Sequence, residues 1–214
     1  MDCRQIHAGE APINLAPDPQ RYQLSFTAGA LYLAGAPIAA ELYLRLRNWA
    51  EVRGVLRADN LLRARTAATT TRWSRELVQR LETLSLEEVE LLADATSEEL
   101  AQLMWTATCR RYALIAEFAE EVLRDRFLLM QTELAHEHFD AFVSGKSLWH
   151  DELSELEPAT FRKLRSNLFT MLREGNLISE GGTIIPTVLS VRVKEHLVRR
   201  TPSDVRFFPT REIA

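Results

Sequence analysis

Basic and polar side chains recur along a helix that the sequence predicts over residues 159 to 174. The residues that this helix would expose are Arg162, Lys163, Arg165, Ser166, Asn167 and Arg173. Arginine binds guanine edges with a forked pair of hydrogen bonds, and asparagine binds adenine in the same way. Arginine and lysine both bind phosphates. In that chemistry Arg165 would contact guanine, Asn167 would contact adenine, and Arg162 and Lys163 would contact phosphates.

A plainer interpretation of the same residues stays open. An amphipathic helix must expose polar side chains somewhere. Arginine is also the default basic residue of this chain, since three of its 26 Lys and Arg residues are lysines. A GC-rich genome favours arginine codons and would produce that bias without any nucleic acid.

A second group of arginines lies in the first half of the chain, where charge is segregated along the sequence. Residues 41 to 80 contain nine arginines and four acidic residues, whereas residues 81 to 100 contain seven acidic residues and no basic one. The overall net charge of −4 therefore conceals a local basic region. Such a region could bind a phosphate backbone, with Arg63, Arg65 and Arg72 as candidates. The alternative is that the basic and acidic regions pair with each other across a helix interface.

Other side chains that often do chemistry have unsuitable spacing here. His136 and His138 are two residues apart in a predicted helix and so point to different faces, which does not suit a metal pair. The run Ser144-Gly145-Lys146-Ser147 ends like a phosphate-binding loop but lacks the earlier glycine and a preceding strand. The sequence contains no GxSxG, HExxH or CxxC motif. We therefore expect no enzyme activity, cofactor, metal site or small-molecule substrate.

Helical periodicity predicts a mainly α protein whose longer first part, residues 21 to 143, is a helical bundle. Residues 1 to 20 are expected to form a flexible arm, because they carry three prolines and little periodicity. Ser85 with Glu88 and Thr96 with Glu99 have the spacing of capping boxes, and therefore predict helix starts. The other expected helices cover 27–34, a segment from Pro37 to Trp49, 51–59, 73–84, a long run from 100 that breaks near 125, and a continuation to 143.

The last part of the chain, residues 144 to 214, has a different pattern. A short helix over 148–156 precedes the helix that Pro158 opens and that Gly175-Asn176 closes. Two short apolar runs then flank Glu180-Gly181-Gly182, which predicts a hairpin. Two helices followed by a hairpin are typical of a winged helix-turn-helix domain, whose second helix enters the major groove of DNA.

Cysteine usage and hydropathy indicate a soluble cytoplasmic protein. The two cysteines, Cys3 and Cys109, are far apart and give no disulfide framework. The N-terminus lacks the apolar core of a signal peptide. The uncharged stretch 22–40 is diluted by Gly, Pro and polar residues, and so favours a buried helical hairpin over a membrane span.

Three segments resemble the BrxA family, whose members are accessory components of the BREX phage-defence systems. They are Tyr22 to Leu31 (YQLSFTAGAL), Asn60 to Thr66 (NLLRART) and Arg165 to Ile178 (RSNLFTMLREGNLI). The resemblance spans about Tyr22 to Phe208. It implies a first part similar to the antitermination factor NusB, a winged second part, and double-stranded DNA binding without catalysis. It implies no particular site residues.

Two hypotheses follow from the sequence. The first is a DNA-binding BREX component that uses the 159–174 helix together with the arginines of residues 41 to 80. The second is an adaptor that binds RNA or protein and docks other BREX proteins.

Overall fold

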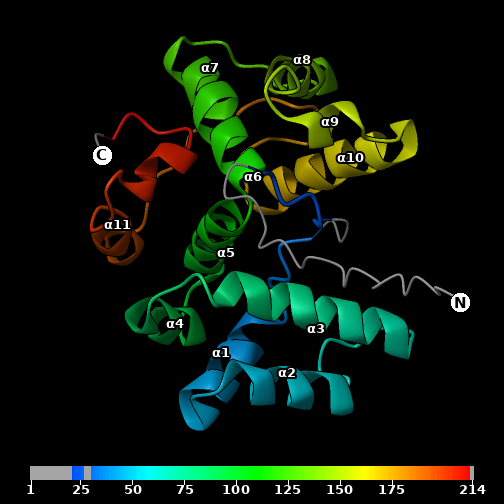
Figure 1. Ribbon diagram of the computed structural model, residues 1–214. Coiled ribbons are helices and arrows are strands. Elements are labelled where there is room, and N and C mark those ends of the chain that lie inside the picture. Colours follow the sequence, from blue (N-terminus) through cyan, green and yellow to red (C-terminus); the bar gives the residue numbers. More distant parts are fainter. Residues whose placement is uncertain (1–20, 27–29, 213–214) are drawn as a thin grey trace, which may run out of the picture.

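The computed structural model describes residues 21–26 and 30–212, and its regular elements are almost entirely helical (Figure 1). The first helices are α1 (Ala36–Leu46), α2 (Trp49–Ala58), α3 (Ala67–Leu81), α4 (Leu86–Ala93) and α5 (Ser97–Arg111). A nearly continuous run follows as α6 (Ala113–Phe118), the π-helix η1 (Ala119–Arg124) and α7 (Asp125–Leu128). The last elements are α8 (His136–Lys146), α9 (Asp151–Ser154), α10 (Pro158–Glu174), α11 (Val191–Leu197) and the 3-10 helix η2 (Asp204–Phe207). The prediction of a mainly α fold is confirmed.

Helix α5 is the axis of the molecule. It is buried on nearly every side from Ala101 to Cys109, and α3, α4, α6 and α11 pack against it. Helices α1 to α4 lie on one side of it, at the bottom of Figure 1, and α6 to α10 lie on the other. A helix buried all round belongs to the interior of a fold. The hydrophobic core accordingly extends from Tyr22 to Phe208 and includes residues of both predicted parts. The predicted boundary after residue 143 falls inside α8.

Short-range signals locate several helix ends correctly. Both predicted capping boxes are present: the Ser85 hydroxyl accepts from Glu88 N and the Thr96 hydroxyl accepts from Glu99 N, while each glutamate accepts from the cap residue's own amide. Proline occupies the first turn of α1 and of α10, where its missing N–H removes no helical hydrogen bond. Local chemistry thus determines where these helices begin.

Other expected boundaries are wrong. Residues 30–34 of the predicted 27–34 helix are not helical, and 27–29 lie outside the described residues. The segment expected to run from Pro37 to Trp49 breaks because Arg47 adopts a left-handed backbone, φ 53°, and Asn48 caps a new helix. The expected 73–84 helix starts earlier, at Ala67, because Thr66 caps it.

The segment between α7 and α8 also departs from the expected helix. The chain leaves the helix after Leu128, and residues 132–134 lie beside the predicted hairpin. In that hairpin Ile178 pairs with Ile184 in an antiparallel bridge, and Thr183 pairs with Glu133 in a second one. Ile184 N donates to Thr132 O at 2.7 Å, and Leu134 N donates to Gly182 O at 2.8 Å. The hairpin prediction is confirmed, and the hairpin gains a third extended segment that the periodicity of the sequence did not reveal.

The described helices include none with the length and apolar character needed to cross a bilayer.

Candidate nucleic-acid interface

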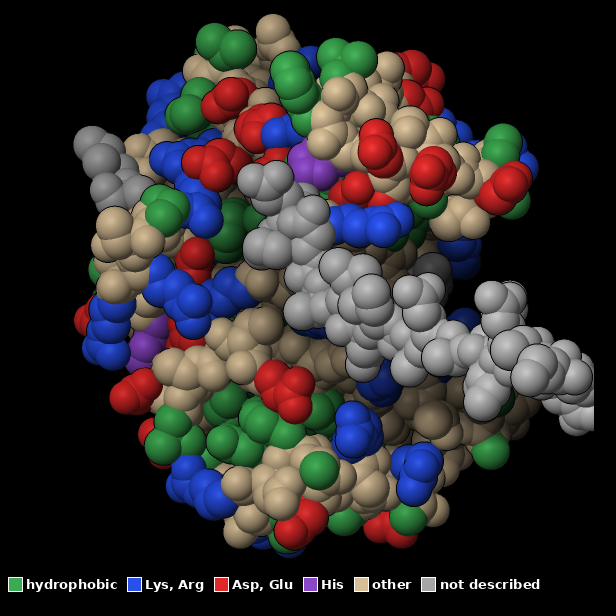
Figure 2. Space-filling model, in the orientation of Figure 1, with side chains coloured by type: hydrophobic (Ala, Val, Ile, Leu, Met, Phe, Trp, Pro, Cys, Tyr) green, Lys and Arg blue, Asp and Glu red, His purple; other side chains and the backbone are tan. Residues whose placement is uncertain are grey.

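Six exposed arginines lie on α2, on α3 and on the loop between them. We call them the arginine surface: Arg53, Arg57, Arg63, Arg65, Arg72 and Arg75. All six are exposed, and none has an ion-pair or hydrogen-bond partner for its guanidinium among residues 21–26 and 30–212. In Figure 2 separate basic side chains stand over α2 and α3 at the lower right. Their guanidinium groups are available for an anion such as a phosphate.

Asn60 organises the loop that carries two of these arginines. Its side-chain oxygen accepts from Ala64 N and from the Thr70 hydroxyl, both at 3.0 Å. Its side-chain nitrogen donates to Ala64 O at 3.0 Å. Together these three bonds tie the loop to the first turns of α3. Arg63 and Arg65 flank the tethered Ala64, so their backbone positions are set while their side chains stay exposed.

The acidic region of residues 81 to 100 does not neutralise the arginine surface. Glu88 makes paired bonds of 2.6 Å to the two terminal nitrogens of Arg110, whose Nε also donates to Asp204 at 2.7 Å. Asp94 and Glu99 pair with Arg192. Glu88 therefore joins α4 to α5, while Asp94 and Glu99 join the end of α4 and the start of α5 to α11. Within the described ranges, no ion pair links residues 81–100 to the arginine surface, which argues against the alternative of mutual pairing.

The pKa of Glu88 reflects the Arg110 contact. Burial by itself would raise the pKa of this carboxyl, because the charged form loses water. The hydrogen bonds and charge of Arg110 outweigh burial and hold the pKa of Glu88 below its ordinary value. The pKa of Arg110 is raised: burial favours the neutral guanidine, but the bonds to Glu88 and Asp204 favour the cation more strongly. Both groups thus stay charged and serve the packing of α4 against α5.

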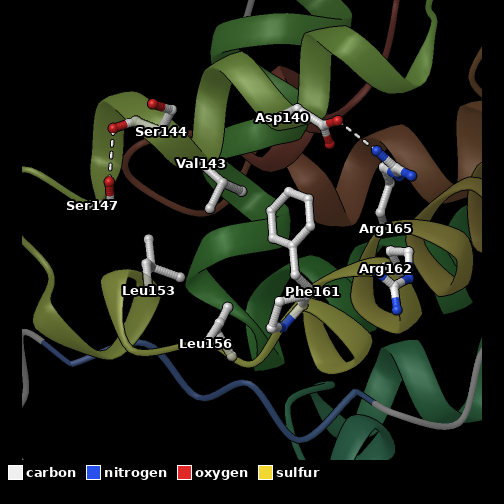
Figure 3. Close-up of a pocket in the computed structure, with 10 residues that line it drawn as sticks. Asp140, Val143, Ser144, Ser147, Leu153, Leu156, Phe161, Arg162 and Arg165 are labelled. Carbon is white, nitrogen blue, oxygen red and sulfur yellow. Dashed lines mark hydrogen bonds and ion pairs between the residues drawn. The ribbon is translucent and has the colours of Figure 1, made fainter.

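The N-terminal half of α10 carries two of the predicted contacts on its surface. Arg162 and Lys163 are exposed and, among the described residues, have no ion-pair partner. Arg165 instead points toward α8, where its Nη1 pairs with Asp140 (Figure 3). A pocket of about 390 Å³ lies at this junction of α8, α9 and α10, with Phe161 and Val143 on its walls. Arg165 therefore needs to leave Asp140 before it can contact a base.

Asn167 is in a different environment from the one expected. Its side chain is 3% exposed, and its amide nitrogen donates to Phe26 O at 2.9 Å. The prediction that Asn167 is exposed and contacts adenine is wrong, because the N-terminal segment covers this face of α10. Ser166 is exposed as expected. Arg173 is partly exposed, and its Nε lies 3.4 Å from the carboxylate of Glu180 at the hairpin turn.

The surroundings of α10 also differ in charge from those of α2 and α3. Acidic side chains gather at the upper right of Figure 2, over α8, α9 and the start of α10. Asp151, Glu155 and Glu157 in this stretch are exposed. Arg162 and Lys163 consequently lie beside several exposed acids, whereas α2 and its C-cap carry two, Glu51 and Asp59, next to the six arginines. The selection of Arg63, Arg65 and Arg72 from the sequence missed Arg53 and Arg57, whose spacing of four residues places them on one face of α2.

The described residues contain no group of three or more His, Cys, Asp or Glu side chains placed to hold a metal ion. Cys109 is buried beside Asp204, and burial raises the pKa of its thiol, so it stays protonated.

The geometry thus defines a class of protein: a helical fold with an exposed basic surface whose arginines have no acidic partner among the described residues. The family model described as BrxA matches residues 20–201. The chain therefore belongs to the BrxA family of the BREX phage-defence systems.

Individual relatives agree with this assignment. The protein called BREX protein BrxA from Paramagnetospirillum magneticum (strain AMB-1) is 24% identical over 163 residues, which are 76% of this chain and 82% of that one. A protein of the same name from Escherichia coli O9:H4 (strain HS) is 24% identical over 119 residues, 56% of each chain. A crystal structure of an uncharacterized protein from Magnetospirillum magneticum superposes with a TM-score of 0.77 at 22% identity, covering 88% of this chain and 99% of that one. That similarity shows the fold.

The three family-like segments have clear structural roles. Within the first segment, residues 22–26 and 30–31 make hydrogen bonds to α3, α6, α9 and α10. Asn60 to Thr66 forms the loop that carries Arg63 and Arg65, and its last residue, Thr66, caps α3. Arg165 to Ile178 supplies most of the buried face of α10 and leads into the first arm of the hairpin. Two of the segments thus shape internal contacts, while Asn60 to Thr66 also presents charge at the surface.

Proposed function

We propose that this protein is a non-catalytic, double-stranded DNA-binding component of a BREX phage-defence system and that it acts in the cytoplasm. The observation that carries the proposal is the arginine surface, with six exposed guanidinium groups that no acid of the described chain neutralises. Unpaired arginines repel one another, and a polyanion relieves that repulsion. A DNA duplex supplies closely spaced phosphates and gains free energy from the release of its condensed counterions.

Helix α10 would provide a second and weaker contact. The expected first helix of this motif, residues 148–156, is only the short α9 (Asp151–Ser154). The order of α9, α10 and the 177–185 hairpin, with residues 132–134 pairing alongside, supports the winged helix-turn-helix interpretation. The N-terminal ends of α10 and α3 and the C-terminal end of α2 all point to the right in Figure 1. A duplex on this side would meet Arg162 and Lys163 as well as the arginine surface. Because Asn167 is buried and Arg165 is paired, contacts to phosphates would dominate and the binding would tolerate different sequences.

The titratable groups with shifted pKa values favour a structural role over a catalytic one. Glu88 holds Arg110, and Glu99 caps α5 and accepts from the Ser190 hydroxyl at 2.7 Å. The carboxylates of Glu88 and Glu99 are thus both satisfied by partners within the folded protein. We propose no reacting group, cofactor or small-molecule substrate for the DNA-binding function.

Fluorescence anisotropy with a labelled duplex of about 20 base pairs tests the proposal. The wild-type protein should bind at low salt, and the double variant Arg65→Gln/Arg72→Gln should bind at least ~10-fold more weakly, because each removes a phosphate contact. The matched control is Arg199→Gln/Arg211→Gln, which removes the same charge from exposed arginines outside this surface. Absence of binding at low salt, or equal loss in both double variants, would overturn the proposal. Structured RNA that displaces the duplex at lower concentration than duplex DNA does would favour RNA as the ligand.

A second candidate function, docking of another BREX protein, rests on a separate observation. Leu148 and Trp149 follow α8 and are 77% and 85% exposed. Large apolar side chains at such exposure mark contact sites, and tryptophan is prominent among residues that dominate binding energy. Purified BREX proteins should then bind the wild type after nuclease treatment and lose at least ~10-fold in affinity with Trp149→Ala. The matched control is Trp49→Leu, since Trp49 is half-buried against Tyr43.

A further inference from the structure

We propose that the cavity between α1, α3 and the α2–α3 loop binds a single nucleotide, with its base against Tyr32 and Trp73 and its phosphate toward Arg63. The cavity has a volume of about 960 Å³. That volume is at the upper end of pockets that hold small organic ligands. The inference goes beyond the proposed duplex binding and does not depend on it, because the cavity takes one nucleotide, not a paired strand.

Aromatic and aliphatic side chains form the walls. The rings of Tyr32 and Trp73 meet edge to face, with centroids 6.1 Å apart and planes at 61°, so they make two sides of a corner. Leu33, Leu61 and Leu62 line the cavity as well. A flat heteroaromatic ring can stack on one wall of such a corner and place its edge against the other. Stacking of this kind is a main source of affinity for unpaired bases.

Tyr32 shows signs of a binding residue. Its backbone is left-handed, φ 58°, and its carbonyl holds the start of α1 by accepting from Gly35 N and Ala36 N. Left-handed backbone at an aromatic residue is costly and concentrates at functional sites. Its hydroxyl is buried and, among the described residues, has no hydrogen-bond partner. That oxygen is closed to solvent in this structure, so a ligand donor or acceptor would reach it only after a small movement of the Tyr32 ring.

Charge around the cavity suits both ends of a nucleotide. Arg63 lies at its edge, and the buried guanidinium of Arg80 lies behind Tyr32, 5.1 Å from the ring centroid. Both favour a phosphate and disfavour a cationic ligand. Asp59 and Glu174 also line the cavity, and one oxygen of Glu174 accepts from Leu31 N. Carboxylates accept from exocyclic amines, so adenine, guanine and cytosine should bind better than thymine.

Isothermal titration calorimetry with dAMP, dGMP, dCMP and dTMP tests this inference. At least one amine-bearing nucleotide should bind wild-type protein with a Kd of about 1 mM or tighter, and dTMP should bind more weakly. Trp73→Leu should weaken binding at least ~10-fold because it removes a stacking wall. The control Trp49→Leu alters a tryptophan that stacks on Tyr43, outside the residues that line the cavity, and should leave the affinity unchanged. Ala34→Trp, which fills the cavity from its exposed edge, should also abolish binding without removing a wall.

The source of the nucleotide is decided in the same titrations. A single-stranded hexadeoxyadenylate that binds at least ~10-fold more tightly than dAMP identifies an unpaired base in a strand, whereas equal affinity identifies the free nucleotide. No heat of binding with any of the five probes at ~10 mM, or equal loss in Trp73→Leu and Trp49→Leu, overturns the inference. Duplex binding measured on the same proteins separates the two proposals, because it should survive Trp73→Leu and Ala34→Trp.

Discussion

Asn167 of α10 donates its side-chain amide to the carbonyl oxygen of Phe26, at 2.9 Å and 141 residues away in sequence. The bond fastens the segment of residues 22–26 to the middle of α10. Tyr22 extends the attachment, since its N–H donates to Glu152 at 2.6 Å and its hydroxyl to Glu117 at 2.6 Å. At residues 30–31, Ala30 O accepts from Arg80 of α3 and Leu31 N donates to Glu174. The two sides of the molecule are thus joined through this segment as well as through α5.

Replacing Asn167 by Leu should therefore destabilise the whole fold. The substitution leaves the buried Phe26 carbonyl without its donor, which costs about 1–3 kcal/mol of the free energy of unfolding. Urea denaturation measures that loss. Ser166→Ala, at the exposed neighbour on the same helix, should change stability by less than about 0.5 kcal/mol. Equal losses in the two variants would show that Asn167 does not hold the segment.

Asn60→Ala should lower both stability and duplex affinity. It removes three hydrogen bonds that fix the loop of Arg63 and Arg65, so the two arginines lose their set positions. We expect a loss of about 1–3 kcal/mol in the free energy of unfolding and a several-fold lower affinity for duplex DNA. The comparison variant is Thr66→Ala, which removes the α3 cap at a cost of about 1 kcal/mol and leaves the Asn60 bonds in place. If both variants weaken DNA binding equally, loop geometry is not the cause.

Stability should fall in acid because of the Glu88–Arg110 contact. The pKa of Glu88 is lower in the folded protein than in the unfolded chain. Its contribution is therefore present above the unfolded pKa and is lost as pH falls through the lower folded pKa, a window below about pH 4.3. Glu88→Gln should cost about 3–5 kcal/mol near pH 7, since it leaves Arg110 buried with one partner fewer. Thermal melting from pH 7 to pH 3 should show a smaller acid-induced loss for Glu88→Gln than for the wild type; parallel curves would contradict this assignment.

Asp140→Asn should strengthen duplex binding. The change removes a negative charge beside α10 and releases Arg165, which now pairs with Asp140. An increase of about two- to five-fold at low salt is expected, comparable to one added phosphate contact near the surface. Glu137→Gln removes an equal charge from the same helix at an exposed position, and should have a smaller effect. If the affinity for duplex DNA does not rise in Asp140→Asn, α10 is not part of the interface.

Sequence patterns identified the features whose partners are close in the chain. Ser85 and Glu88 are three residues apart and form the cap that begins α4. Pro158 opens α10 by its own ring geometry. The hairpin was likewise visible in residues 177 to 185. These predictions depend on local backbone chemistry, which periodicity and turn residues report directly.

Sequence patterns of this kind do not reveal contacts between residues that are far apart in the chain. Asn167 looks like an exposed polar residue because the segment that buries it lies 141 positions earlier. Likewise, the order of charges suggested that residues 81–100 could neutralise 41–80, whereas Glu88 meets Arg110 and Asp94 meets Arg192. Burial by tertiary packing, not propensity, decides which polar side chains remain available.

The salt dependence of duplex binding tests the arginine surface most directly. Plotted as the logarithm of the association constant against the logarithm of salt concentration, the slope changes by about 0.9 for each phosphate contact. The account predicts a steep negative slope for the wild type and one shallower by about 3–4 for the variant with Gln at positions 57, 63, 65 and 72. A variant slope equal to that of the wild type would contradict the account, because the four arginines would then release no counterions from DNA.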